Sequence, residues 1–285
     1  MNKRVSYSKR RLHTCILLIA FSVFSQNLLG QCIMSMGYRL EDKSPFMAAS
    51  PDNRGFYFDL YSQAVKAIDC QLQVVRRTKK RILADLSTGK VDFYPAYNYS
   101  EKRLNAVYFI TTGIMKKNVG ISRETLADIS QLSQLKGRVV ILPLGSINHY
   151  KDIESIQIYE IPNMGFEKAI SLLKRERGDF YYANYSEFLY YLKQRPLNTV
   201  TGNDWAPKVH HDCCGGEKRV YLAFSRRSPH FKDKANPDFK SEQAISIANL
   251  PRILDPSSKA YQFESALIRL EAEGKTQKIY DQYFR

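Results

Sequence analysis

The sequence predicts an α/β protein made of two lobes, and three observations lead to this prediction. Its 285 residues are enough for two lobes with a substantial core. Short strand-like runs alternate with amphipathic helical segments through short connections, a pattern typical of βαβ units around a parallel sheet. A second series of the same kind starts near residue 119. Two series favour two lobes with a cleft between them, where ligands bind at the carboxyl ends of strands.

The first series runs from residue 32 to about residue 103. It predicts strands at 32–38, 71–77 and 90–97, and helices at 56–68 and 80–89. The first of these helices keeps its apolar residues on one face, as expected for a helix that packs on a sheet. After the third strand, Asn98 to Ser100 are predicted to cap a helix whose first turn contains Arg103.

The second series repeats this design, with a loop glycine before a buried strand. It predicts strands at 118–122, 138–146, 154–162 and 179–185, and helices at 125–137, 165–178 and 186–196. The segment 258–284 then predicts two C-terminal helices that are interrupted at Gly274.

The first thirty residues have the pattern of a secretory signal peptide. Five Lys and Arg residues precede the apolar stretch CILLIAFSVF, and SQNLLGQ then supplies small and polar residues suited to cleavage. We therefore predict a cleaved leader at 1–30 and a periplasmic location. The stretch LLGQC leaves lipid attachment at Cys32 as an alternative, although Gln31 occupies the position where lipoprotein motifs have a small residue.

Composition and charge restrict the classes of partner. The chain is 44% hydrophobic and 25% charged, which is typical of globular proteins rather than disordered ones. Its formal net charge of +15 would suit nucleic acid, but export argues against that partner. Anionic small ligands or an anionic envelope surface are more consistent with an exported basic protein. We expect a monomer.

Four cysteines remain after cleavage of the leader. Cys32 begins the first predicted strand and Cys70 precedes the second, so a parallel pairing of these strands predicts a Cys32–Cys70 disulfide in an oxidising compartment. The run HHDCCGG, from His210 to Gly216, leaves three interpretations open: a transition-metal site, a structural loop or a Cys213–Cys214 link.

Five segments occur in the order and spacing seen in the extracellular solute-binding protein family 3. They are GFYFDLYSQAVKAI, LSTGKVDFYPAYNYSEKR, LKGRVVILPLGS, RGDFYYAN and EAEGKTQKIYDQYF. The sequence therefore resembles the periplasmic amino-acid-binding proteins of bacterial ABC transporters over nearly all of the mature chain. This resemblance implies a two-lobed periplasmic binding protein-like fold of type II that closes about a hinge. It implies that 31–115 and 219–285 form lobe 1 and that 116–218 forms lobe 2.

The resemblance also implies which residues hold a ligand. Arg103 matches the arginine of the family's S-x-x-R turn, which clamps the ligand carboxylate, and Asn98 and Ser100 lie near the same strand end. A guanidinium suits this role because its planar fork pairs with two carboxylate oxygens. Ser146 matches the residue of lobe 2 whose hydroxyl contacts the same ligand carboxylate in the family. A solvent-exposed arginine and an ordinary capping serine are the alternatives.

The chain departs from the family pattern at three positions. Asn184 stands where amino-acid binders place the acid that holds the ligand ammonium, and Lys43 and Lys79 stand about where the family has aromatic residues. These replacements favour an anion without a free amine, such as a dicarboxylate. Solvated lysines are the alternative.

No catalytic or cofactor motif stands out. The chain lacks G-x-S-x-G, H-E-x-x-H and a glycine-rich phosphate loop, so we predict no cofactor and no enzyme activity. The predicted function is capture of a small carboxylate-bearing ligand for uptake through an ABC transporter. A ligand-sensing envelope protein and a periplasmic dehydratase-like enzyme on the same fold are the alternatives.

Overall fold

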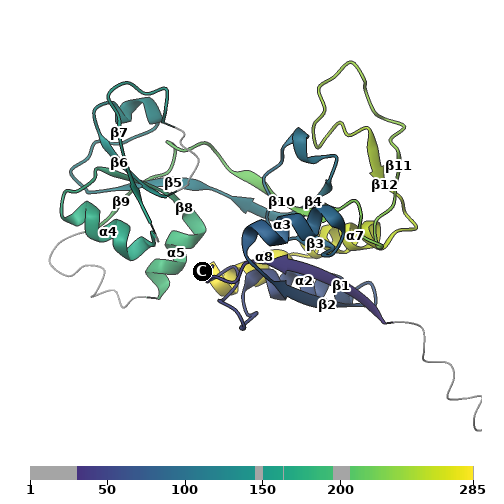
Figure 1. Cartoon of the computed structure of the whole chain (residues 1–285). Helices are drawn as coiled ribbons and strands as arrows, with labels where there is room; N and C mark the ends of the chain where they lie inside the picture. Colours follow the sequence, from purple (N-terminus) through teal and green to yellow (C-terminus); the bar gives the residue numbers. More distant parts are fainter. Residues whose placement is uncertain (1–30, 145–149, 163, 195–205, 285) are drawn as a thin grey trace, which may run out of the picture.

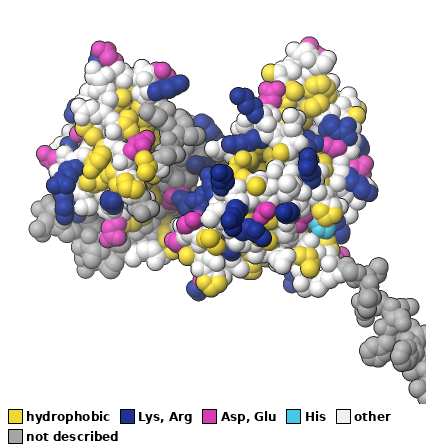
Figure 2. Space-filling model, in the orientation of Figure 1, with side chains coloured by type: hydrophobic (Ala, Val, Ile, Leu, Met, Phe, Trp, Pro, Cys, Tyr) yellow, Lys and Arg dark blue, Asp and Glu magenta, His cyan; other side chains and the backbone are white. Residues whose placement is uncertain are grey.

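The computed structural model describes residues 31–144, 150–162, 164–194 and 206–284. These residues form two lobes, each built around a five-stranded sheet, with a hollow between them (Figures 1 and 2). The predicted leader at 1–30 and Ser146 lie outside the described residues. None of the helices in the described ranges combines the length and apolar content needed to cross a bilayer.

The sheet of lobe 1 has the strand order β2-β1-β3-β10-β4. Its strands are β1 (Cys32–Tyr38), β2 (Cys70–Arg76), β3 (Phe93–Tyr94), β4 (Val107–Lys116) and β10 (Lys218–Ser225). The first three strands run parallel, whereas β10 is antiparallel to both of its neighbours.

The sheet of lobe 2 repeats this arrangement in the order β7-β6-β8-β5-β9. Its strands are β5 (Asn118–Ser122), β6 (Val139–Pro143), β7 (Gln157–Ile161), β8 (Phe180–Asn184) and β9 (Lys208–His210). Here β6 is parallel to β7 and β8, and β5 is antiparallel to β8 and β9.

In both sheets the antiparallel strand is the one that enters from the other lobe. Strand β5 follows β4 with Lys117 alone between them, and β10 follows β9 through a short loop. The chain therefore crosses between the lobes twice, and each crossing delivers a strand into the middle of the receiving sheet (Figure 1). Strand β4 ends at Lys116 and β10 begins at Lys218; the lobe boundaries 31–115, 116–218 and 219–285 remain a proposal.

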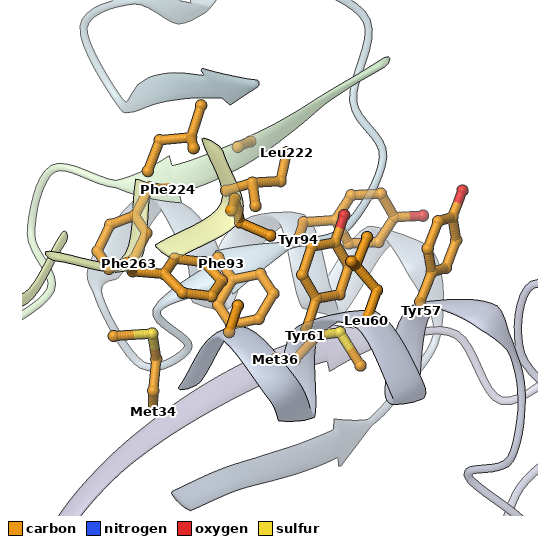
Figure 3. Close-up of a cluster of buried hydrophobic side chains, with 14 of the residues drawn as sticks. Met34, Met36, Tyr57, Leu60, Tyr61, Phe93, Tyr94, Leu222, Phe224 and Phe263 are labelled. Carbon is orange, nitrogen blue, oxygen red and sulfur yellow. The ribbon is translucent and has the colours of Figure 1, made fainter. Parts of the chain in front are cut away.

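Six α-helices are described. Those of lobe 1 are α2 (Phe56–Lys66), α3 (Lys79–Thr88), α7 (Lys259–Ala272) and α8 (Lys275–Phe284), and those of lobe 2 are α4 (Phe166–Lys174) and α5 (Tyr185–Lys193). Helices α7 and α8 are separated at Gly274, as predicted. The core of lobe 1 is rich in aromatic rings, with Phe93, Phe224 and Phe263 packed against one another (Figure 3).

Asp92, which directly precedes β3, connects strands of lobe 1 through hydrogen bonds. Its buried carboxylate accepts hydrogen bonds from the backbone N–H and hydroxyl of Ser35 and from the hydroxyl of Ser228. These partners come from β1 and from the turn after β10. The carboxylate therefore fixes the returning strand β10 against the strands that precede it in the chain.

Two local predictions were wrong. The expected helix at 125–137 is reduced to a short 3-10 helix, Leu132–Leu135, because the N–H groups of Ser130 and Gln131 donate to the side chain of Gln134 instead of to helical carbonyls. The expected helix after Ser100 is likewise a three-residue 3-10 helix, Glu101–Arg103.

The predicted Cys32–Cys70 disulfide is present. The two cysteines are direct neighbours on the parallel strands β1 and β2, and their Cα atoms are 4.5 Å apart. Because this bond occupies the thiol of Cys32, lipid attachment to the same sulfur is incompatible with the structure. The bond joins residues 38 positions apart and ties the edge strand to the sheet.

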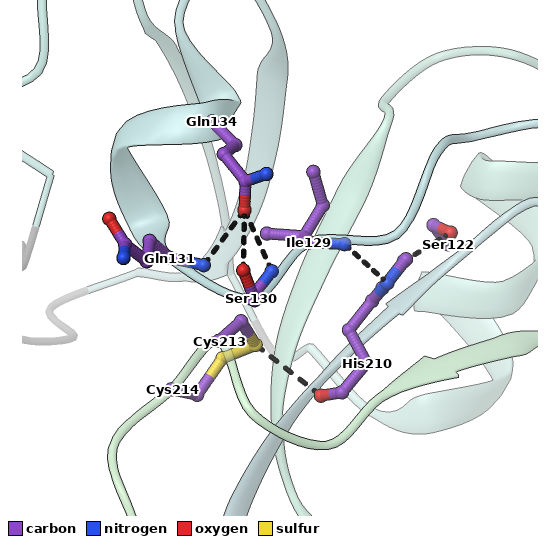
Figure 4. The surroundings of a disulfide bond; sticks show 8 residues. All are labelled: Ser122, Ile129, Ser130, Gln131, Gln134, His210, Cys213 and Cys214. Carbon is purple, nitrogen blue, oxygen red and sulfur yellow. Dashed lines mark hydrogen bonds between the residues drawn. A yellow bond between two sulfur atoms is a disulfide. The ribbon is translucent and has the colours of Figure 1, made fainter.

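A second disulfide joins the neighbours Cys213 and Cys214 in the loop between β9 and β10 (Figure 4). Both cysteines are buried. Cys213 packs against β5 at Gly120, where an added Cβ would meet the Cys213 sulfur and would lie 2.1 Å from the ring of Phe180. Of the three interpretations for this run, the structure contains the Cys213–Cys214 link.

His210 is buried beside this link and both of its ring nitrogens are engaged (Figure 4). Nδ1 accepts the backbone N–H of Ile129, so Nε2 carries the proton and donates to the hydroxyl of Ser122 at 2.8 Å. That hydroxyl donates onward to the carbonyl of Arg123. Burial lowers the pKa of His210, and the positive charge of Lys208 lowers it further. The fold of lobe 2 therefore requires a neutral imidazole.

The Cys32–Cys70 bond should stabilise the folded protein. We expect the double variant Cys32→Ala/Cys70→Ala to lose roughly 2–4 kcal/mol of unfolding free energy, because the bond restricts a long loop in the unfolded chain. Denaturant unfolding of both proteins under non-reducing conditions measures the difference. A free thiol at Cys70 in the exported wild-type protein would contradict the assignment.

The neutral state of His210 predicts a dependence of stability on pH. As pH falls below about 6.5, the unfolded chain takes up a proton that folded His210 resists, so the unfolding free energy of the wild type should decrease. His210→Gln should show a flatter dependence, whereas His211→Gln, at an exposed position, should behave as the wild type. Urea unfolding at about pH 7, 6 and 5 compares the three; equal slopes for His210→Gln and wild type would refute the assignment.

Candidate functional site

Three cations lie together at the carboxyl edge of the lobe 1 sheet. Arg39 directly follows β1, Lys79 is the first residue of α3, and Arg103 ends the 3-10 helix after β3. Although Lys79 is exposed, partial loss of hydration lowers its pKa, and the positive charges of Arg39 and Arg103 lower it further. We define Arg39, Lys79 and Arg103 as the cation cluster, in which both arginines repel the charge of Lys79.

Arg103 is held in place by its own strand end. Its guanidinium lies 4.1 Å from the centroid of the Tyr97 ring, and Nη1 donates to the backbone carbonyl of Asn98 at 2.7 Å. This hydrogen bond uses one of the five N–H donors of the guanidinium. Asn98 thus contributes its backbone to the site, while the side chain of Ser100 makes no capping hydrogen bond to the 3-10 helix.

Arg39 is a candidate that sequence reasoning missed. Its side chain lies beside the phenol of Tyr94, and its Nε is buried with no hydrogen-bond partner among the described residues. Burial acts to lower the pKa of Arg39, but the nearby Tyr94 oxygen more than offsets this effect, so the pKa is raised and the charge is retained. The available signal was its position immediately after the first strand, at the edge where ligands bind.

Asn184 and Glu187 form the facing part of lobe 2. Asn184 ends β8 and caps α5, with its side-chain oxygen accepting the N–H of Glu187 at 3.1 Å. Because the oxygen is used in this cap, the amide NH₂ is the group that Asn184 has to offer a ligand. Glu187, which sequence reasoning also missed, forms an ion pair across the lobes with Lys43, 2.8 Å away. It stands at the N3 position of α5, where acids favour helix starts.

The crossing strands add further positive charge. Lys116, at the end of β4, is paired in register with Lys218, at the start of β10. Although Lys116 is exposed, partial loss of hydration lowers its pKa, with the carboxylate of Glu187 opposing the shift and Lys43 and Lys218 adding to it. Lys and Arg side chains accordingly gather around the hollow between the lobes (Figure 2).

A cavity of about 580 Å³ lies beside these groups but does not include the cation cluster. Its walls come from the loop Asp42–Ser44 of lobe 1 and from α4 and α5 of lobe 2, with Phe166, Tyr181 and Glu187 among them. The cation cluster, rather than this cavity, has the donors that an anion needs.

The structure does not support metal binding by the run His210 to Cys214. Both imidazole nitrogens of His210 have protein partners, and the two cysteine sulfurs are bonded to each other. Across the described ranges, no group of three or more His, Cys, Asp or Glu side chains is arranged to hold a metal ion.

Comparisons with known proteins identify the family. Residues 40–285 match the family described as bacterial extracellular solute-binding proteins, family 3. A search of curated proteins found no match.

Solved structures show the same fold. An ancestral arginine-binding protein bound to arginine has 20% identity and a TM-score of 0.57, covering 89% of this chain and 98% of its own. An ancestral amino acid-binding protein described as a precursor of cyclohexadienyl dehydratase has 17% identity and a TM-score of 0.59, covering 89% and 95%. The L-cystine solute receptor of Neisseria gonorrhoeae, unliganded and open, has 15% identity and a TM-score of 0.58, covering 89% and 93%.

These structural similarities support the two-lobed type II fold, and the family match covers most of the chain. The resemblance seen in the sequence is thereby confirmed: the chain belongs to the bacterial extracellular solute-binding proteins of family 3.

Proposed function

We propose that the chain is a periplasmic solute-binding protein that captures a small carboxylate-bearing ligand between its lobes and delivers it to an ABC-type transporter. The observation that carries this proposal is the cation cluster of Arg39, Lys79 and Arg103 at the carboxyl edge of the lobe 1 sheet. A bound carboxylate would relieve the repulsion within the cluster, and arginine forks would supply paired hydrogen bonds. The family, whose members are extracellular, supports export.

Lobe 2 would close over the same anion. Asn184 would donate its amide NH₂, and Ser146, which lies outside the described residues, is proposed to add a hydroxyl. Asn98 and Ser100 would complete the lobe 1 side, Asn98 by the carbonyl that orients Arg103.

The charge balance favours an anion over a zwitterion. Arg39, Lys79 and Arg103 face one side, and Lys43 already neutralises the Glu187 carboxylate. A ligand ammonium would therefore have to compete with Lys43 for Glu187, since Asn184 has no charge. The structural neighbour bound to arginine shows that relatives take zwitterions, so Glu187 is the group through which an amino acid would be accommodated instead.

The two alternatives differ in what they require. A dehydratase needs a carboxylic acid that acts on the bound ligand, and Glu187, one of the acids that line the cavity between the lobes, is held by Lys43. This arrangement favours binding over catalysis, although one structural neighbour is described as a dehydratase precursor. A ligand-sensing envelope protein would use the same cleft, and co-purification of transporter subunits or of a sensor distinguishes the two.

Arg103 should be essential for binding and dispensable for folding. Arg103→Ala leaves a ligand carboxylate unpaired and should weaken binding by roughly 2–5 kcal/mol. Lys102→Ala, at the exposed neighbouring position, is the matched control and should bind as the wild type. Calorimetry with the ligand identified by the screen described next measures both, and an unchanged affinity for Arg103→Ala would place the site elsewhere.

The ligand class can be tested with one thermal-shift screen of amino acids, dicarboxylates and other small acids. We expect dicarboxylates to raise the melting temperature of the wild type more than zwitterionic amino acids do. Asn184→Asp supplies the missing acid and Lys43→Met releases Glu187, so both should shift the preference toward amino acids. Tight binding of an ordinary amino acid by the wild type would refute the anion proposal and retain the solute-binding one.

A further inference from the structure

Helix α5 of lobe 2 carries two packing faces. Phe188, Tyr191 and Leu192 pack into the core of lobe 2. Ser186, Tyr190 and Lys193 recur three or four positions apart, which places them along another face of the helix. These three residues all contact lobe 1.

The contacts of the second face join α5 to the C-terminal helix α8. The hydroxyl of Ser186, which is only 5% exposed, hydrogen-bonds with the hydroxyl of Tyr280. Lys193 donates to the backbone carbonyl of Gln282 at 3.3 Å, and the ring of Tyr190 packs against the core of lobe 1. Near the start of α5, the Lys43–Glu187 ion pair adds a contact with the loop after β1.

Helix α8 is itself fixed to lobe 1. The ring of Tyr280 stacks on Phe284 with centroids 4.3 Å apart and meets Phe56 of α2 edge-on. The hydroxyl of Tyr283 donates to Asp59, also on α2. Lobe 2 therefore contacts a helix that packs directly on α2 of lobe 1.

We propose that the α5–α8 contact is a latch that holds the two lobes together. It is a second connection, independent of the crossing strands, because it joins helices rather than strands (Figure 1). Ser186, the residue of this contact nearest the start of α5, lies between Asn184 and Glu187 in the chain, so the latch presets the lobe 2 half of the site. Only this last consequence rests on the proposed function.

The latch can be tested without any ligand. Small-angle X-ray scattering of the ligand-free wild type should match the curve calculated from the structure, and Ser186→Arg, which places a large charged group in the contact, should increase the radius of gyration and the maximum dimension. Tyr283→Phe is the matched control, because it removes a hydroxyl contact from the same helix within lobe 1, and should leave both values unchanged. A folded Ser186→Arg protein with the wild-type curve would refute the latch.

The pair Ser186→Ala/Tyr280→Phe provides a second variant that avoids a buried unpaired hydroxyl and so keeps the fold. Hydrogen exchange should be faster than in the wild type in α5 and at the Tyr280 end of α8, and unchanged in α4. Unaltered exchange in α5 would refute the latch even if Ser186→Arg fails to fold. Because neither measurement uses a ligand, failure of the latch is distinguishable from failure of the proposed function.

Discussion

Strand exchange between the lobes is the constraint on which the rest of the structure depends. Strand β3 is only two residues long and pairs with β1 at one position, so β10 is needed to join β3 to β4 and make one continuous sheet. That strand arrives only after the chain has traversed lobe 2. The buried Asp92 carboxylate then bonds the turn after β10 to β1. Lobe 1 therefore completes its sheet with a strand that follows lobe 2 in the chain, and the backbone groups of β3 and β4 depend on that strand for their partners.

The same exchange produces the electrostatics of the site. Parallel strands β1 and β3 end at the same edge of the sheet, which brings Arg39 and Arg103, far apart in the sequence, to the surroundings of Lys79. The crossing strands place Lys116 beside Lys218. Lys79 is exposed to solvent, and partial loss of hydration together with the charges of Arg39 and Arg103 lowers its pKa. An anion bound between the lobes, as proposed, would oppose that repulsion and couple binding to lobe approach by charge.

Two kinds of connection hold the lobes. At the crossing strands the lobes are joined by the continuous polypeptide chain, and these strands are hydrogen-bonded into both sheets. The α5–α8 contact instead consists mainly of side-chain contacts, which can separate without breaking either sheet. Such a contact can set the resting arrangement of the lobes while still allowing them to move. Because Asn184 caps α5, a movement of this helix is also a movement of the proposed ligand groups.

The sequence by itself determined what depends on local pattern: the alternating strands and helices, the break at Gly274, and the Cys32–Cys70 pairing, which follows from adjacent parallel strands. It did not determine the crossing strands, because exchange between sheets depends on partners that are distant in the sequence. It also predicted a helix at 125–137 that does not form at full length, because capping by Gln134 depends on side-chain geometry. The site was predicted in the same uneven way. Arg103 was found from its motif, whereas Arg39 and Glu187 became candidates only through contacts with groups remote in sequence, Tyr94 and Lys43, which only the folded chain brings within reach.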